Sequence, residues 1–306
     1  MASQSKIAVL AALGGDLAVT VTKFVAAAIT GSAAMWSEGI HSAADSSNQV
    51  LLLIGMRRSK RRSDTEHPFG HGKELYFWSL LVAVLIFGGG GGVSVYEGIL
   101  RIRKPIVLGD PKWSYIVLGC ALVFESISLA VALRAFLAES GHGNILNKIT
   151  TSKNPATYTV VAEDTAAIAG IFVAAAGVFF SHYLKIPIID GVASVIIGLL
   201  LATVATFLIR ESRGLLVGEG VNPKTEEEIR QIASKGAPVN SISRPLTMYL
   251  GPSDVLLILD VRFNSAANIS DVAEEIERMK SRIRERFPEL RKIYIDIDSA
   301  PTEPHT

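Results

Sequence analysis

The chain has 306 residues, of which 49% are hydrophobic and 19% are charged, and its mean hydropathy is +0.36. Soluble domains are usually about a quarter charged, so this composition argues against a wholly soluble protein. The formal net charge of +1 indicates no nucleic-acid partner, and the single cysteine, Cys120, excludes an internal disulfide.

Six segments are long and apolar enough to cross a bilayer, which takes about 20 mostly apolar residues. They are residues 7–29, 33–56, 75–99, 113–137, 157–184 and 188–209. The first lacks the basic leader and the cleavage site of a removed signal peptide, so we interpret it as a retained helix. We expect residues 1–210 to form an all-α, six-helix transmembrane domain.

Basic residues cluster at 57–62, in the connection between the second and third spans. Lys and Arg are enriched in cytoplasmic connections, so this one is predicted to be cytoplasmic. Six crossings then place both termini in the cytoplasm. The chain begins without an organelle-targeting extension, which favours a bacterial inner membrane.

The third span contains five consecutive glycines, Gly88 to Gly92. Such a run disfavours a helix in water, whereas in lipid small residues let helix backbones approach closely. The run therefore predicts tight helix packing, for example at a dimer seam, with a hinge as the alternative.

After the last span the composition changes to that of a small soluble α+β domain, residues 211–306. The expected order is α-β-β-α-β: a helix at 226–234 opened by Thr225 and Glu228, strands at 246–250 and 255–263, a helix capped by Ser270, and a strand at 292–298. About 90 residues is small for a stable core, so pairing with a second copy is expected.

The second span carries a polar stripe of Glu38, His41, Asp45 and Asn48, at helical spacings of three, four and three. Ionisable residues inside a membrane are rare and are functional candidates. His41 and Asp45 share one helix face and together provide half of a divalent-metal site. The alternative is hydrogen bonding between helices.

The fifth span contains the adjacent acids Glu163 and Asp164, which point about 100° apart on a helix. Only one of them is expected to face the cavity that holds His41. Two further acids inside apolar segments, Glu125 and Asp16, are interpreted as structural partners, with Asp16 placed near Lys23.

The connection after the second span contains Asp64, His67 and His71, together with two glycines. Three nitrogen or oxygen donors within eight residues could hold a cation in a loop. The alternative is a glycine-hinged loop whose histidines pack against lipid head groups.

Together these features resemble the cation diffusion facilitator family. The resemblance rests on the six spans, His41-x3-Asp45, the loop motif His-Pro-Phe-Gly-His-Gly-Lys at 67–73 and the α+β tail, and it covers nearly the whole chain. It implies a homodimeric metal/proton antiporter in the lipid bilayer. Carried over by position, His41, Asp45 and Asp164 are transport-site ligands, and Asp64, His67 and His71 form a loop metal site.

The chain departs from the family pattern in two places. A second donor usually precedes the fifth-helix aspartate by four residues, but Val160 occupies that position. Glu163 or water is then expected to complete the site. The tail has one histidine, His305, where many members bind metal through several. The Glu163-Asp164 pair is similar to the zinc transporter 9-like subgroup.

We therefore expect a secondary transporter, not an enzyme, that exports divalent transition metals in exchange for protons. Zinc is the first expectation, with iron, cobalt, nickel and manganese as alternatives, and no resident cofactor is expected. Two competing hypotheses are a non-transporting membrane protein for metal sensing or interaction, and a membrane-embedded metallohydrolase. The second lacks a convincing general base beside the three ligands.

Overall fold

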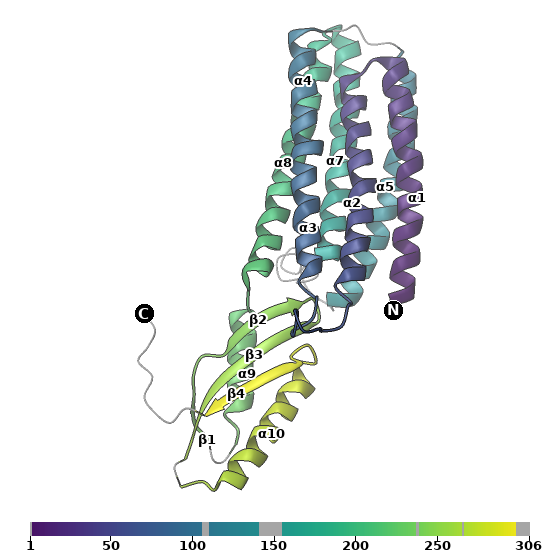
Figure 1. Cartoon of the computed structure of the whole chain (residues 1–306). Helices are drawn as coiled ribbons and strands as arrows, with labels where there is room; N and C mark the ends of the chain where they lie inside the picture. The colour runs from purple at the N-terminus through teal and green to yellow at the C-terminus, as the bar shows by residue number, and fades with distance from the viewer. Residues whose placement is uncertain (1, 106–109, 141–154, 237–238, 265, 298–306) are drawn as a thin grey trace. The chain divides into compact units, whose positions relative to one another are not determined.

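The structure is a computed structural model that describes residues 2–105, 110–140, 155–236, 239–264 and 266–297 (Figure 1). The chain divides into two compact units. The first comprises residues 1–58 and 74–213, and the second comprises residues 59–73 and 214–306. The connection that carries Asp64, His67 and His71 therefore belongs to the same unit as the C-terminal segment.

The first unit is a bundle of long helices that lie side by side (Figure 1). They are α1 (Ala2–Thr30), α2 (Ala33–Arg58), the continuous run α3 (Glu74–Leu85), η1 (Ile86–Gly92) and α4 (Val93–Arg103), then α5 (Pro111–Ser140), α7 (Pro155–Leu184) and α8 (Ile188–Val217). Small and aliphatic side chains such as Ala27, Ala174 and Ile197 are fully buried and form its core.

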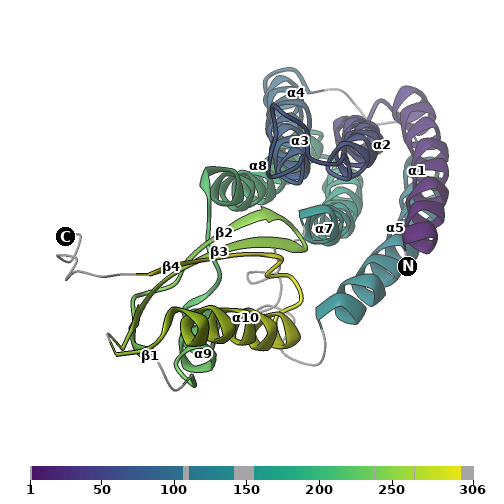
Figure 2. The same cartoon turned by 60° about the horizontal axis from the view of Figure 1, so that its bottom comes forward.

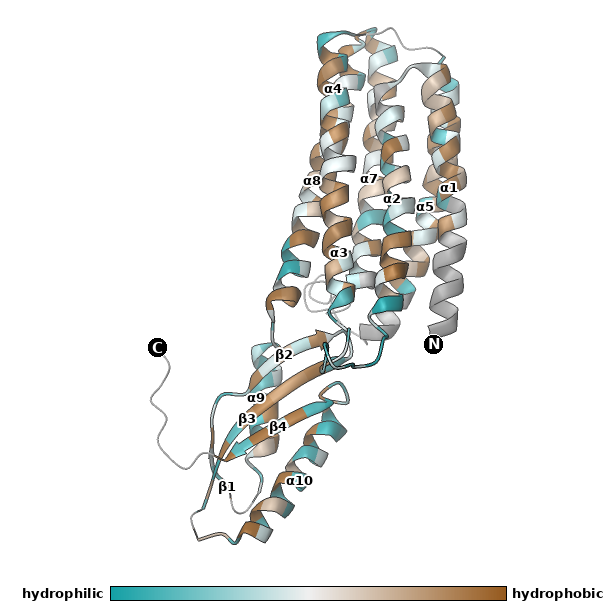
Figure 3. Ribbon diagram, viewed as in Figure 1, coloured by the Kyte–Doolittle hydropathy of each residue, from teal (hydrophilic) through white to brown (hydrophobic). Residues whose placement is uncertain are grey.

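The outer surface of the bundle is apolar. Leu17, Val21, Val25 and Ile29 repeat at every fourth position of α1, and all four are more than half exposed. Within the described residues, four stretches are long and apolar enough to cross a membrane: 74–103, 111–134, 158–184 and 188–217. The polar stripe of α2 lowers its mean hydropathy, and strongly hydrophilic residues mark its C-terminal end (Figure 3). The predicted helical membrane domain is confirmed.

The glycine run forms a π-helical segment, η1, and part of it packs against α8. A Cβ on Gly198 would lie 2.7 Å from the carbonyl oxygen of Gly91, and one on Gly191 would lie 2.9 Å from that of Gly98. Two pairs of glycines, seven residues apart on each helix, thus bring two backbones together. Tight packing was predicted here, and it occurs within one chain.

The second unit contains a four-stranded sheet centred on β3 (Asp254–Phe263). β1 (Val239–Ile242) and β2 (Leu246–Gly251) pair antiparallel with successive parts of β3, and β4 (Lys292–Ile297) pairs parallel with it. β2 and β3 form the hairpin predicted around residues 251–254. The short strand β1 is an addition to the predicted order.

Helices α9 (Pro223–Ala233) and α10 (Ile269–Arg286) lie together on one face of this sheet (Figure 2). Ile229, Met279 and Ile283 pack there against the alternate buried residues of β3. The predicted capping box is wrong in position, because Asn222 caps α9 by accepting a hydrogen bond from the Thr225 amide. Pro223 occupies the first turn, where its missing amide proton costs nothing. The predicted α+β fold class is confirmed.

Candidate metal centre

The polar stripe of α2 faces the interior of the bundle. Glu38 and Asn48 are fully buried, His41 is 1% exposed and Asp45 is 8% exposed. The Nδ1 atom of His41 lies 3.5 Å from Oδ1 of Asp45. Neither ring nitrogen of His41 has a hydrogen-bond partner among the described residues. A buried imidazole with open nitrogens beside a carboxylate can accept a proton or a metal ion.

The acids of α7 lie next to this stripe. The Asn48 side chain donates a 2.9 Å hydrogen bond to Oε1 of Glu163, and the Ser128 hydroxyl on α5 bonds to Asp164. Glu163 is also close enough to Asp45 to interact with it electrostatically. Both adjacent acids are therefore buried among polar neighbours from other helices. That only one of them faces the cavity of His41 stays a prediction.

The bundle residues do not gather around one point in this conformation. Within the described part of the chain, Asp64, His67 and His71 are the one group of three or more His, Cys, Asp or Glu residues whose donor atoms all lie within 4.8 Å of one another. Of the four transport-site candidates, His41 and Asp45 approach each other, while Glu163 and Asp164 are held by Asn48 and Ser128. One ion bound by all four would require these two hydrogen bonds to rearrange.

A buried cation on α1 lies beside the stripe. The Lys23 ammonium donates to Oε2 of Glu38 at 3.0 Å and to the Ser42 hydroxyl at 2.7 Å. The sequence predicts Asp16 near Lys23, and the two do interact electrostatically, while the hydrogen-bond partner of Asp16 is Gln49. The clue to a buried pair was Lys23 itself, because Lys6 is the only other lysine or arginine in residues 1–56.

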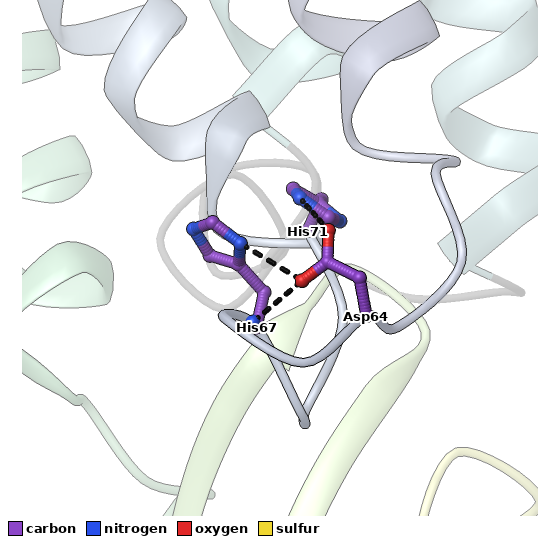
Figure 4. A group of neighbouring side chains, drawn as sticks. All are labelled: Asp64, His67 and His71. Carbon is purple, nitrogen blue, oxygen red and sulfur yellow. Dashed lines mark hydrogen bonds and ion pairs between the residues drawn. The ribbon is translucent and has the colours of Figure 1, made fainter.

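The loop donors converge in the second unit (Figure 4). Oδ1 of Asp64 accepts the His67 backbone amide at 2.6 Å and lies 3.2 Å from Nδ1 of His67. Oδ2 of Asp64 lies 3.4 Å from Nε2 of His71. Zinc binds such atoms at about 2.0–2.2 Å, so donors this close can share one ion.

Hydrogen bonding prepares these donors for a cation. Nδ1 of His71 lies 3.1 Å from the Arg62 carbonyl oxygen. Because a carbonyl oxygen can only accept a hydrogen bond, Nδ1 carries the proton, and the lone pair of Nε2 in the neutral ring can bind a metal. The His67 backbone amide holds the pKa of the exposed Asp64 carboxyl below its usual value, so Asp64 is ionised at neutral pH.

The loop is fastened to the strands of its own unit. Lys292 on β4 donates a 2.6 Å hydrogen bond to the Phe69 carbonyl oxygen, and its ammonium lies 5.2 Å from the centre of the Phe69 ring. Gly72 passes so close to β2 that a Cβ there would clash with the Leu250 carbonyl oxygen. The shape of the loop thus depends on the C-terminal segment.

The chain is similar to known membrane transport proteins. Residues 9–217 match the family described as the cation efflux transmembrane domain. Similar proteins include the "Proton-coupled zinc antiporter SLC30A9, mitochondrial" of Homo sapiens, 28% identical over 314 residues that cover 90% of this chain and 55% of that protein. The chain therefore spans about half the length of this relative.

Two further relatives differ in their named roles. "Metal tolerance protein C4" of Arabidopsis thaliana is 30% identical over 263 residues, covering 85% of this chain and 57% of that protein. "Manganese efflux system protein MneP" of Bacillus subtilis is 27% identical over 306 residues, covering 96% of both chains. Zinc and manganese thus both occur among the names of similar proteins.

Proposed function

This chain belongs to the cation efflux family, and we propose that it exports divalent transition metals, zinc first, across a membrane in exchange for protons. It is an integral, multi-pass membrane protein and a transporter, not an enzyme. The observation that carries the proposal is the buried pair of His41 and Asp45, which leaves both imidazole nitrogens open inside an apolar bundle.

In the proposed mechanism His41, Asp45 and Asp164 hold the metal, and Glu163 or water completes its coordination. Imidazole with carboxylate oxygens suits zinc, and it also accepts iron, cobalt and nickel. Because the similar MneP is named for manganese, manganese remains an alternative substrate. An ion that binds through three protein ligands can also leave, as transport requires.

Proton exchange follows from the chemistry of the donors. A metal binds only the neutral imidazole and the ionised carboxylate, so loading releases protons and protonation releases the metal. Against an inside-negative potential, exporting two positive charges costs about 4.6 kcal/mol per 100 mV, and each proton that enters returns about half of this. One-for-one exchange would therefore need an additional proton or metal gradient.

We place the basic run 57–62 and both termini in the cytoplasm and assign the protein to a bacterial inner membrane. The full-length match to the bacterial MneP supports this assignment. We also propose a homodimer, because the strands of the small C-terminal domain expose Leu246, Tyr294 and Ile297, each more than half accessible. Light scattering of the detergent-solubilised protein tests the dimer.

Transport into proteoliposomes with an imposed pH gradient tests the function. We expect the wild type to move zinc and His41→Ala and Asp45→Ala to lose most of that flux. Ser47→Ala is the matched control, since Ser47 lies exposed on the same helix and donates a hydrogen bond to the Ala43 carbonyl oxygen in its own turn. Normal zinc flux in both ligand variants would refute the site assignment.

The alternative is a metal-sensing membrane protein that does not transport. It is favoured by one observation, namely that the donors Asp64, His67 and His71 belong to the unit that contains the C-terminal domain. Stoichiometric zinc binding by the wild type without any flux in vesicles would support this alternative over transport.

A further inference from the structure

We propose that Lys23 sets the metal preference of the transport site, because it neutralises Glu38 and keeps that carboxylate from acting as a ligand. This inference rests on the proposed function and on the same bundle site. The observations that support it are the burial of an ion pair beside His41, the geometry of Glu38 and the charges that surround Asp45.

Lys23 and Glu38 form an ion pair that is closed to water. Both side chains have no accessible surface, and Nζ of Lys23 lies 3.0 Å from Oε2 of Glu38. The second bond of the ammonium goes to the hydroxyl of Ser42, the residue that follows His41. A buried charge is costly unless it is paired, so the two residues hold each other in place.

Glu38 would otherwise be available to a metal. It precedes His41 by three positions and Asp45 by seven, and it therefore lies on the same face of α2. Its second oxygen, Oε1, has no hydrogen-bond partner among the described residues. This oxygen points toward α7 at Gly170, where a Cβ would come within 2.7 Å of it. The carboxylate thus reaches across the bundle between α1 and α7.

Lys23 also adds a fixed positive charge to an acidic neighbourhood. Asp45 interacts electrostatically with Glu163, Glu125 and Asp16, and Lys23 is the one cation that acts on it within the described chain. The same ammonium acts on His41. A fixed positive charge weakens the binding of a divalent cation, and this repulsion is larger inside a protein than in water.

Two consequences follow from this arrangement. With Glu38 paired to Lys23, the proposed site offers the imidazole of His41 with the carboxylates of Asp45 and Asp164, and an imidazole donor suits zinc. If Lys23 were neutral, Glu38 would add a hard oxygen donor one turn from His41, and carboxylate-rich sites favour manganese. Lys23 is therefore a positioning residue that acts through Glu38 and through charge.

The test compares zinc and manganese uptake by proteoliposomes under a fixed pH gradient. Lys23→Met should raise the preference for manganese over zinc by about tenfold or more, since it releases Glu38. Glu38→Gln should weaken the apparent affinity for both metals by about tenfold, because the ammonium is left uncompensated. The double variant Lys23→Met/Glu38→Gln carries neither charge and should return to within about threefold of the wild-type preference.

The two single variants are expected to change different quantities, the metal preference in Lys23→Met and the affinity for both metals in Glu38→Gln, and this difference distinguishes the proposed role from a structural one. If both single variants weaken both metals equally, or if Lys23→Met leaves the preference unchanged, the inference is overturned. Should Lys23→Met fail to fold, the double variant and Lys23→Arg decide, since both avoid an unpaired charge. Lys23→Arg should keep the zinc preference, and its loss in folded protein would count against the inference. A wild type that moves neither metal would instead defeat the proposed function.

Discussion

Asn48, which lies one turn after Asp45 on α2, donates a 2.9 Å hydrogen bond to Glu163 on α7. This bond holds the glutamate, while its neighbour Asp164 keeps one oxygen, Oδ2, without a hydrogen-bond partner among the described residues. The two adjacent acids are therefore not equivalent. Asp164 also accepts a hydrogen bond, from Ser128, but its Oδ2 is open to a metal. The Asn48 bond must break before Oε1 of Glu163 can bind one.

Substitution of these two acids should affect transport to different degrees. We expect Asp164→Asn to lower zinc flux by about a hundredfold or more, because it removes a ligand, and Glu163→Gln to lower it by less than about tenfold. Initial rates in proteoliposomes measure both. Equal losses would mean that Glu163 is as essential as Asp164 and that the Asn48 bond breaks during every cycle.

The glycines between η1 and α8 should be intolerant of even one methyl group. Because a Cβ on Gly198 would lie 2.7 Å from the Gly91 carbonyl oxygen, Gly198→Ala should destabilise the bundle by about 1–3 kcal/mol. Gly89→Ala is the control, since a Cβ there meets no atom within 4 Å. We expect the control to be neutral or slightly stabilising in thermal unfolding in detergent, as alanine is the better helix former. Similar losses in both variants would contradict the close-packing interpretation.

Zinc binding to the loop should depend on the Asp64 carboxylate in a characteristic way. The amide of His67 depresses the pKa of Asp64, so the folded loop favours the charged form. The contribution of the Asp64 carboxylate to the stability of the folded loop is then fully present above the pKa of about 3.9 that it has in the unfolded chain. This contribution is lost as the pH falls through the lower pKa that Asp64 has in the folded loop.

Calorimetric zinc titrations of wild type and Asp64→Asn between pH 5 and 8 test this expectation. The variant should bind more weakly by about tenfold or more, and the ratio of the two affinities should stay constant across that range. Glu66→Gln, an exposed acid in the same loop, should bind like the wild type. A ratio that shrinks toward pH 5 would show that Asp64 titrates there and that its pKa is raised, against the direction expected from the His67 amide.

The contact between Lys292 and Phe69 predicts a distant effect on the same loop. Lys292→Met removes the hydrogen bond to the Phe69 carbonyl oxygen and the cation over its ring, so the loop donors should be less well ordered. The affinity of the loop for zinc should fall by about threefold to tenfold, which corresponds to part of the free energy of a hydrogen bond from a charged group. Lys280→Met is the control, since Lys280 pairs with the exposed Glu277 on α10. Unchanged affinity in Lys292→Met would mean that the loop holds its shape alone.

Much of the fold could be predicted because its signals are local. Apolar length predicts the helices of the bundle, and alternation with turn residues predicts the β2–β3 hairpin around Gly251. Strand β1 was missed because Val239–Ile242 is short and half polar, and it exists by pairing with the end of β3. The start of α9 was displaced by three residues because the prediction relied on the capping box of Thr225 and Glu228 and passed over Asn222, which is followed by Pro223.

In the candidate sites too, residues close in sequence could be predicted to lie together, and residues far apart in sequence could not. His41 with Asp45, and Asp64 with His67 and His71, were found because short spacings place them together. The pairing of Lys23 with Glu38 was missed because the two residues are 15 apart in sequence and lie on different helices. Whether they meet depends on how α1 packs against α2 and on the length of both side chains. The same holds for Asn48 and Glu163, which are 115 residues apart.

The division of the chain has a consequence for how its parts can be exchanged between relatives. Residues 59–73 interrupt the membrane segment in sequence but belong with residues 214–306 as one compact unit. A chimera that exchanges only the C-terminal segment would separate Phe69 from Lys292, which donates a hydrogen bond to it, and Gly72 from its neighbour Leu250. The loop and the tail should therefore be inherited together, so that substitutions in one are matched by substitutions in the other.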